Sequence, residues 1–108
     1  MESLAHYVAA ILQNSPEPVI TRHETQRQSW IDQGYEVKQQ QSTYWFANGV
    51  VIRREQEQDS FPSAELCAEC WICYQVLEHG PRDKITPERQ TFASSCREQF
   101  WLAYHCAP

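Results

Sequence analysis

The chain has 108 residues, a formal net charge of −5 and a hydrophobic share of 42% that includes four tryptophans. This length corresponds to one domain, and the composition allows a packed core and excludes a disordered chain. No stretch approaches the roughly 20 apolar residues of a membrane-spanning helix. The N-terminus lacks the basic and apolar regions of a signal peptide. We therefore expect a single cytoplasmic domain, residues 1–108, without membrane association.

The negative charge is concentrated in the second half of the chain. Residues 1–54 contain five acidic and five Lys or Arg residues, whereas residues 55–108 contain nine acidic residues and four Lys or Arg. No Lys or Arg occurs between Arg54 and Arg82. Such a surface repels a phosphate backbone and attracts basic proteins, so we expect no binding to nucleic acid.

Two helices are predicted in the first third of the chain. The first covers residues 3–14, where a serine is the N-cap and apolar residues recur at helical spacing. The second covers about residues 22–33, because residues 21–24 fit a capping box and Gly34 fits the left-handed position after a helix. The apolar face of the first helix consists of Leu4, Val8, Ile11 and Leu12.

Residues 44–52 give the clearest local signal in the chain. The dipeptide Asn48-Gly49 separates two runs with high β-propensity, and Asn-Gly is a strong hairpin signal because both turn residues adopt positive φ. Residues 35–39 can add a third strand. The sequence therefore predicts a three-stranded antiparallel meander at about residues 35–56.

A two-residue turn also predicts the register of this hairpin. It pairs Trp45 with Ile52 on one face of the sheet, and Phe46 with Val51 on the other. Both faces are partly apolar near the turn. Either helices cover both faces, or one face is a contact surface.

Two further helices are predicted in the second half. Residues 63–79 begin with a serine N-cap and end at Gly80-Pro81, and most of their large apolar side chains fall on one helical face. Their β-branched and aromatic content also fits a strand, but the segment is longer than a typical strand. The last helix begins at Thr86-Pro87, with the threonine as N-cap and the proline in the first turn. Its apolar stripe consists of Phe92, Cys96, Phe100 and Ala103.

The predicted order of elements is α–α–β–β–β–α–α. It describes an α+β domain in which a small antiparallel meander packs on N-terminal and C-terminal helices. A winged helix also combines helices with a hairpin, but it requires a basic recognition face. The predicted helices are neutral or acidic, so this alternative is disfavoured.

Three of the five cysteines fall within seven residues. Their Cys-x-x-Cys spacing can place two thiolates at one zinc ion. The run is rich in large apolar residues rather than turn residues, and free cysteine is among the most buried residue types. We expect core thiols that stay reduced in the cytoplasm. The alternative is a zinc module held by Cys67, Cys70, Cys73 and Cys96, with Cys106, His79 or His105 as further candidate ligands.

No motif for catalysis is present. The three glycines occupy turn or cap positions, so there is no phosphate-binding loop and no dinucleotide fingerprint. A small thiol or histidine enzyme centred on Cys96 and His105 is the enzymatic alternative. We expect a protein that is not an enzyme and has no cofactor.

These observations predict a non-catalytic interaction domain, such as an inhibitor, an immunity-type protein or a regulatory adaptor. An acidic face from residues 55–78 would lie beside an aromatic hairpin, since tryptophan and tyrosine are enriched at binding hot spots. The expected partner is a basic protein, attracted by the acidic face, or a second copy of the chain. The residues predicted to bind it are Tyr44, Trp45, Arg53, Glu55, Glu57, Asp59 and Glu65.

Overall fold

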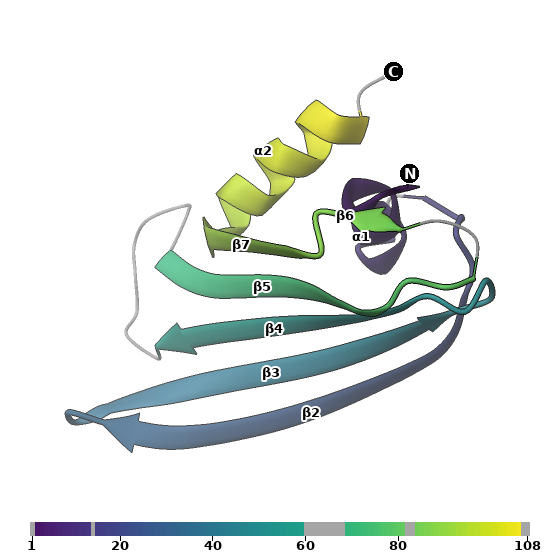
Figure 1. The fold of residues 1–108 in the computed structure, drawn as a ribbon. Helices are drawn as coiled ribbons and strands as arrows, with labels where there is room; N and C mark the ends of the chain where they lie inside the picture. The colour runs from purple at the N-terminus through teal and green to yellow at the C-terminus, as the bar shows by residue number, and fades with distance from the viewer. Residues whose placement is uncertain (1, 14, 60–68, 82–83, 107–108) are drawn as a thin grey trace.

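The structure is a computed structural model that describes residues 2–13, 15–59, 69–81 and 84–106 (Figure 1). Within these residues, the main element is a five-stranded antiparallel sheet accompanied by two helices. The elements in chain order are β1 (Glu2–Ser3), α1 (Leu4–Ile11), β2 (Ile20–Asp32), β3 (Tyr35–Phe46), β4 (Val51–Asp59), β5 (Glu69–Glu78), β6 (Ile85–Thr86), β7 (Arg89–Ser94) and α2 (Ser95–Cys106).

The strands of the sheet follow the order β2-β3-β4-β5-β7, and each pair of neighbours is antiparallel. The short strands β1 and β6 pair in parallel beside it. The predicted three-stranded meander with the element order α–α–β–β–β–α–α is therefore wrong. The domain is mostly sheet, and no described helix is long and apolar enough to cross a membrane.

Both helices lie on the same face of the sheet. The Tyr7 ring of α1 packs edge-on against Phe46 of β3, with ring centroids 4.9 Å apart, and Glu98 of α2 bonds to Tyr74 of β5. Directly paired residues share a face of a sheet, and the strand pairings place Phe46 and Tyr74 on the same one. We call this the helix-covered face and the opposite side the open face.

Helix α1 is buried on almost all sides. Ser3 is the N-cap, as predicted, and its side chain accepts a hydrogen bond from the backbone N–H of Ala5. The helix ends at Ile11, before the predicted position 14. All of its residues except His6 are buried, including alanines outside the predicted apolar face. Burial on all sides is typical of a core helix rather than a surface helix.

The predicted helix at residues 22–33 is wrong, because this segment forms β2. It pairs with β3 along its length, from Ile20 opposite Phe46 to Asp32 opposite Tyr35. Gln33 and Gly34 both have positive φ, 51° and 84°, as a two-residue hairpin turn requires. The glycine thus takes the predicted backbone conformation, but in a hairpin rather than at a helix end.

The predicted helix at residues 63–79 is also wrong where the structure describes it, because residues 69–78 form β5. Alternate residues of this strand are buried on the helix-covered face, namely Cys70, Ile72, Tyr74 and Val76. Trp71 and Leu77 point to the other side and are exposed. This period of two is that of a strand with one face in the core. The predicted cap at Ser63 lies outside the described residues.

The last helix is confirmed, but it begins later than predicted. Thr86 lies in β6, and residues 89–94 form β7, so that Phe92 packs in the core as a strand residue. Helix α2 begins at Ser95, and the backbone N–H of Arg97 donates to Oγ of Ser94 at 3.2 Å. Ser94 therefore caps this helix in place of the predicted threonine.

The predicted hairpin around Asn48-Gly49 is confirmed, but its register differs by one residue. Trp45 pairs with Val51 rather than with Ile52. The backbone N–H of Phe46 donates to the carbonyl of Val50 at 2.9 Å, which leaves a three-residue loop ending in a positive-φ glycine. A shift of one residue changes which side chains of the two strands share a face. Phe46 and Ile52 both lie in the core, whereas Trp45 and Val51 both lie on the open face.

Candidate functional site

The residues predicted to bind a partner divide between the two faces of the sheet. Tyr44 lies on the helix-covered face, where its ring stacks on His23 with centroids 4.6 Å apart. The side chains of Asp59 and Glu65 lie outside the described part of the structure. The strand pairings place the other four predicted residues together on the open face. These four are Trp45, Arg53, Glu55 and Glu57.

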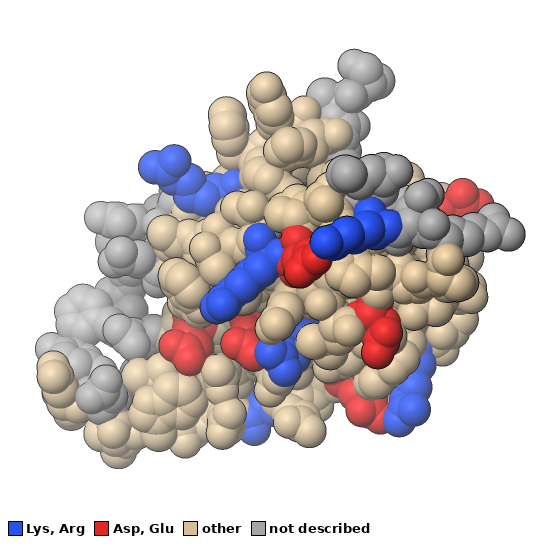
Figure 2. All heavy atoms as spheres, in the orientation of Figure 1, with Lys and Arg blue, Asp and Glu red and all other residues tan. Residues whose placement is uncertain are grey.

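Polar contacts hold these open-face side chains in place. Arg53 forms an ion pair with Glu55 at 3.2 Å and donates to Gln75 on the neighbouring strand at 2.9 Å. Gln39 donates to Glu57 at 3.1 Å. Basic and acidic side chains also lie interspersed on the side of the molecule seen in Figure 2. The charged side chains on the open face are therefore held by specific contacts, and basic side chains lie close to acidic ones.

The described cysteines do not form the zinc site that was the alternative to core thiols. Cys70 and Cys73 are both free thiols and both buried, and Cys70 belongs to the hydrophobic core, as expected of a core thiol. They are three residues apart on one strand, so their side chains point to opposite faces of the sheet and cannot bind one ion. Cys96 is disulfide-bonded, which corrects the expectation that every cysteine is a thiol. No group of three potential metal ligands lies together among the described residues.

The alternative catalytic pair is not formed either. Cys96 and His105 both lie on α2, and nine residues of helix separate them by about 13.5 Å along its axis. The disulfide at Cys96 also removes the thiol that such an enzyme would need. His79, a further candidate ligand, instead accepts a hydrogen bond at Nδ1 from the backbone N–H of Ile85 at 3.0 Å.

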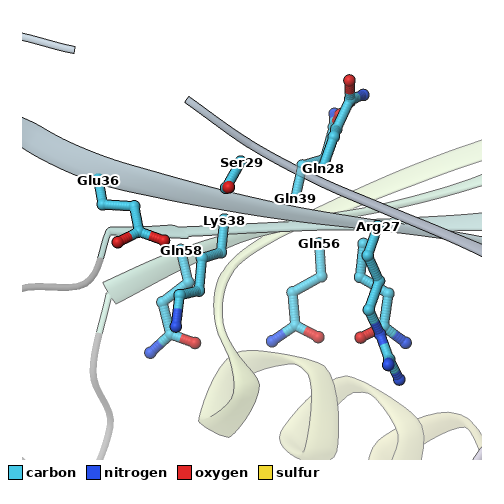
Figure 3. A pocket seen from close by; sticks show the side chains of 9 residues that line it. Arg27, Gln28, Ser29, Glu36, Lys38, Gln39, Gln56 and Gln58 are labelled. Atoms are coloured by element: carbon cyan, nitrogen blue, oxygen red, sulfur yellow. The ribbon is translucent and has the colours of Figure 1, made fainter. Parts of the chain in front are cut away.

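A groove of about 470 Å³ lies where β2, β3 and β4 run side by side. Figure 3 shows the side chains of Arg27, Lys38, Gln56 and Gln58 pointing toward the side on which a helix lies. The strand pairings place Gln40 on this face too. The described residues that line it are Arg27, Gln28, Ser29, Glu36, Lys38, Gln39, Gln40, Gln56 and Gln58.

The groove is locally positive in a protein that is negative overall. Its charged lining residues are Arg27, Lys38 and Glu36, which gives one net positive charge, whereas the whole chain carries −5. Neither Arg27 nor Lys38 forms an ion pair with a described residue. Both cations are therefore available to a negatively charged ligand.

A buried polar cluster lies beside the groove and joins α2 to the sheet. Arg54 forms an ion pair with Glu98 at 3.1 Å, and their side chains are only 15% and 3% exposed. The Tyr74 hydroxyl donates to Glu98 at 2.6 Å and accepts from Nε of Arg54 at 2.8 Å. Arg54 also donates to Gln56 at 3.0 Å. The groove wall is thus hydrogen-bonded to the α2 contact.

The cluster changes the proton affinity of two of its members. Burial raises the pKa of Tyr74 far above its ordinary value, and the negative charge of Glu98 adds to this, although Arg54 opposes it. Burial lowers the pKa of Arg54, but the interactions with Tyr74 and Glu98 outweigh it, so the net shift is upward. Arg54 therefore stays charged and Tyr74 stays neutral at physiological pH.

We expect Tyr74 to keep its proton while the protein is folded. Its folded pKa lies above the unfolded value of 10.0, so its contribution to stability is present below pH 10 and is lost as the pH rises above it. A titration of the absorbance of the five tyrosines should show that Tyr74 ionises only when the protein unfolds. The Tyr74→Phe variant should show one tyrosine fewer in this late step. Ionisation of every tyrosine near pH 10 in the folded protein would contradict the expectation.

Sequence reasoning missed the residues of the groove and the cluster. The available signal was polar residues two apart on neighbouring strands, at positions 38 and 40 and at positions 56 and 58. This spacing places each pair on one face. The spacing gives no sign that a third strand lies beside these two. The segment that forms β2, which contains Arg27, was predicted to be a helix. Glu98 was assigned correctly to a helix, but nothing local marks it as buried.

Comparison of the sequence with protein-family models and curated proteins, and of the fold with solved structures, finds no match.

Proposed function

We propose that this protein is a non-catalytic protein-interaction domain whose polar groove binds an extended acidic segment of a partner protein. One observation carries the proposal: two cations with no ion-pair partner among the described residues, and three glutamine amides, line the same cavity of about 470 Å³ on three adjacent strands (Figure 3). The cations are Arg27 and Lys38, and the amides are those of Gln40, Gln56 and Gln58.

Charge supports an acidic ligand. Arg27 and Lys38 lie on neighbouring strands and have no described ion-pair partner. Complementary charge across an interface gives specificity and speeds association. Because the rest of the chain is acidic, an acidic segment would be repelled elsewhere and attracted here, which would direct it to the groove.

The spacing of the amides supports an extended peptide. Gln56 and Gln58 are two residues apart on β4, and Gln40 lies directly opposite Gln56 on β3. Two residues of a strand span about 6.8 Å, which is also the repeat of an extended peptide. Each glutamine offers a donor and an acceptor, so the amides can bond to successive backbone groups. The described lining residues include one hydroxyl, on Ser29, and no histidine or cysteine, which fits binding better than catalysis.

The test is an NMR titration with two peptides of opposite charge, hexaglutamate and hexalysine. We expect hexaglutamate to shift backbone signals at positions 27, 38, 40, 56 and 58. The double variant R27E/K38E should weaken hexaglutamate binding at least tenfold, because both cations become repulsive. The R97E variant is the control: Arg97 is an exposed cation on α2 and does not line the groove.

Two outcomes would overturn the proposal. One is an absence of hexaglutamate binding, or binding that R27E/K38E leaves unchanged. The other is preferential binding of hexalysine with shifts centred on Glu55 and Glu57, which would instead favour a basic partner. Binding to the groove should also weaken as salt is raised, since exposed charges are screened.

A further inference from the structure

Although charges of both signs are interspersed on the open face of the sheet, its two halves have opposite net charges. Counting only the described side chains, the half nearer the Asn48-Gly49 turn carries one net positive charge, and the half farther from it carries two negative charges. The strand pairings place Arg22, Glu24, Arg53, Arg89 and Glu78 in the first half, and Glu55 and Glu57 in the second. Arg53 and Glu55 are successive open-face residues of β4 and lie on either side of the division.

Exposed apolar side chains lie in both halves of this face. Leu77 belongs to the half nearer the turn, at a β-bulge where Val51 pairs with Glu78 and Ile52 pairs with Val76. Trp71 belongs to the other half of the same strand, β5. Their exposed fractions are 42% and 46%. No described helix covers them, because both helices lie on the other side of the sheet. Tryptophan is a frequent anchor of protein interfaces.

We propose that the open face binds the open face of a second copy of this chain. The two-fold axis lies in the plane between the two sheets, runs across the strands and passes between Arg53 and Glu55. It places each half of one open face against the opposite half of the other. Arg53 then lies over Glu55 of the second copy, and Trp71 lies over Leu77 of the second copy. A two-fold interface requires such self-complementarity, and face-to-face sheets stack at about 10 Å.

The size of the face indicates a weak dimer. Five strands are separated by four spacings of about 4.8 Å, and the nine residues of β4 by eight rises of about 3.3 Å. The open face therefore covers roughly 500 Å² per copy. Two copies would bury roughly 1,000 Å² in total, which is the lower limit for a specific interface. We therefore expect reversible association that depends on concentration. It uses the face opposite the groove, so both sites can be occupied together.

The test is sedimentation equilibrium of the full chain from about 1 to about 500 µM, a range suited to a small interface. We expect a monomer–dimer equilibrium. The variants R53E and E55R should each weaken association at least tenfold, because each places like charges in contact across the axis. An equimolar mixture of the two variants should associate again, since one face is then more acidic and the other more basic.

The mixing experiment separates a lost interface from a damaged fold. The Arg53–Glu55 pair is at the surface, so either substitution alone should change stability by less than about 1 kcal/mol. R97E on α2 should dimerise like the original chain, and so should the groove variant R27E/K38E. The proposal is overturned if the unchanged chain is a monomer throughout this range, or if mixing R53E with E55R restores no association.

Discussion

Replacing Glu98 with alanine is expected to lower the free energy of unfolding by about 3–5 kcal/mol, the usual cost of removing one partner of a buried ion pair. Arg54 would keep its charge in a site where its side chain is 15% exposed. The Tyr74 hydroxyl would also lose the carboxylate to which it donates at 2.6 Å. Because this cluster connects α2 to β4 and β5, the loss should loosen the helix as well as lower stability.

Urea unfolding followed by tryptophan fluorescence measures this loss. The control is Glu55→Ala on the opposite face of β4, where Glu55 pairs with Arg53 and the two side chains are 28% and 30% exposed. An ion pair this accessible to water contributes at most about 1 kcal/mol. E98A and E55A each remove a glutamate that pairs with an arginine of β4, so the difference between them reports the effect of burial.

A second comparison tests whether the cost of E98A comes from the stranded charge. The triple variant R54M/Y74F/E98L replaces the whole cluster with apolar groups of similar size. Such replacements are often neutral or stabilising, because desolvation of the charges no longer opposes folding. The triple variant should therefore be more stable than E98A. If E98A costs less than about 1 kcal/mol, the cluster does not hold α2 on the sheet.

Local signals in the sequence predicted some elements correctly. Ser3 caps the first helix, and the Asn48-Gly49 dipeptide lies in the turn of a hairpin. Each of these features depends on a few adjacent residues. The hairpin register failed by one residue because Gly49 ends a three-residue loop instead of forming half of a two-residue turn.

The sequence prediction missed strands β2 and β5, which flank β3 and β4, for different reasons. The β2 segment is polar and exposed on both faces, so it has neither a strand-like nor a helix-like apolar period, and its capping box decided the prediction. In β5, residues 70, 72, 74 and 76 alternate with period two, but the neighbouring apolar residues also gave a broad helical face. In both segments, pairing with a neighbouring strand outweighs the local preference.

The candidate groove depends on contacts between segments distant in the sequence. Its lining comes from β2, β3 and β4, and each strand contributes polar residues that are unremarkable alone. The buried cluster depends in the same way on Arg54, Tyr74 and Glu98, which lie on three elements. A single sequence without variation between relatives gives no signal for such long-range proximity.

Replacing Ala10 with glutamate is expected to cost about 3 kcal/mol or more, because it places a carboxylate in the core. Ala10 lies outside the predicted apolar face of α1, yet only 6% of it is exposed, and it belongs to the hydrophobic core. The A10Q variant should also be destabilised, since a large amide is crowded there without a charge. Melting curves by circular dichroism would measure both losses.

The matched control is His6→Glu, one helical turn earlier on the same side of α1. His6 is the exposed residue of this helix, so H6E should change stability by no more than about 0.5 kcal/mol, with a small gain expected from an acidic residue in the first turn. The sequence pattern alone treats positions 6 and 10 alike, as the outer side of an amphipathic helix. Equal tolerance of H6E and A10E would mean that α1 lies on the surface of the domain. A large loss for A10E alone would establish that α1 is enclosed in its core.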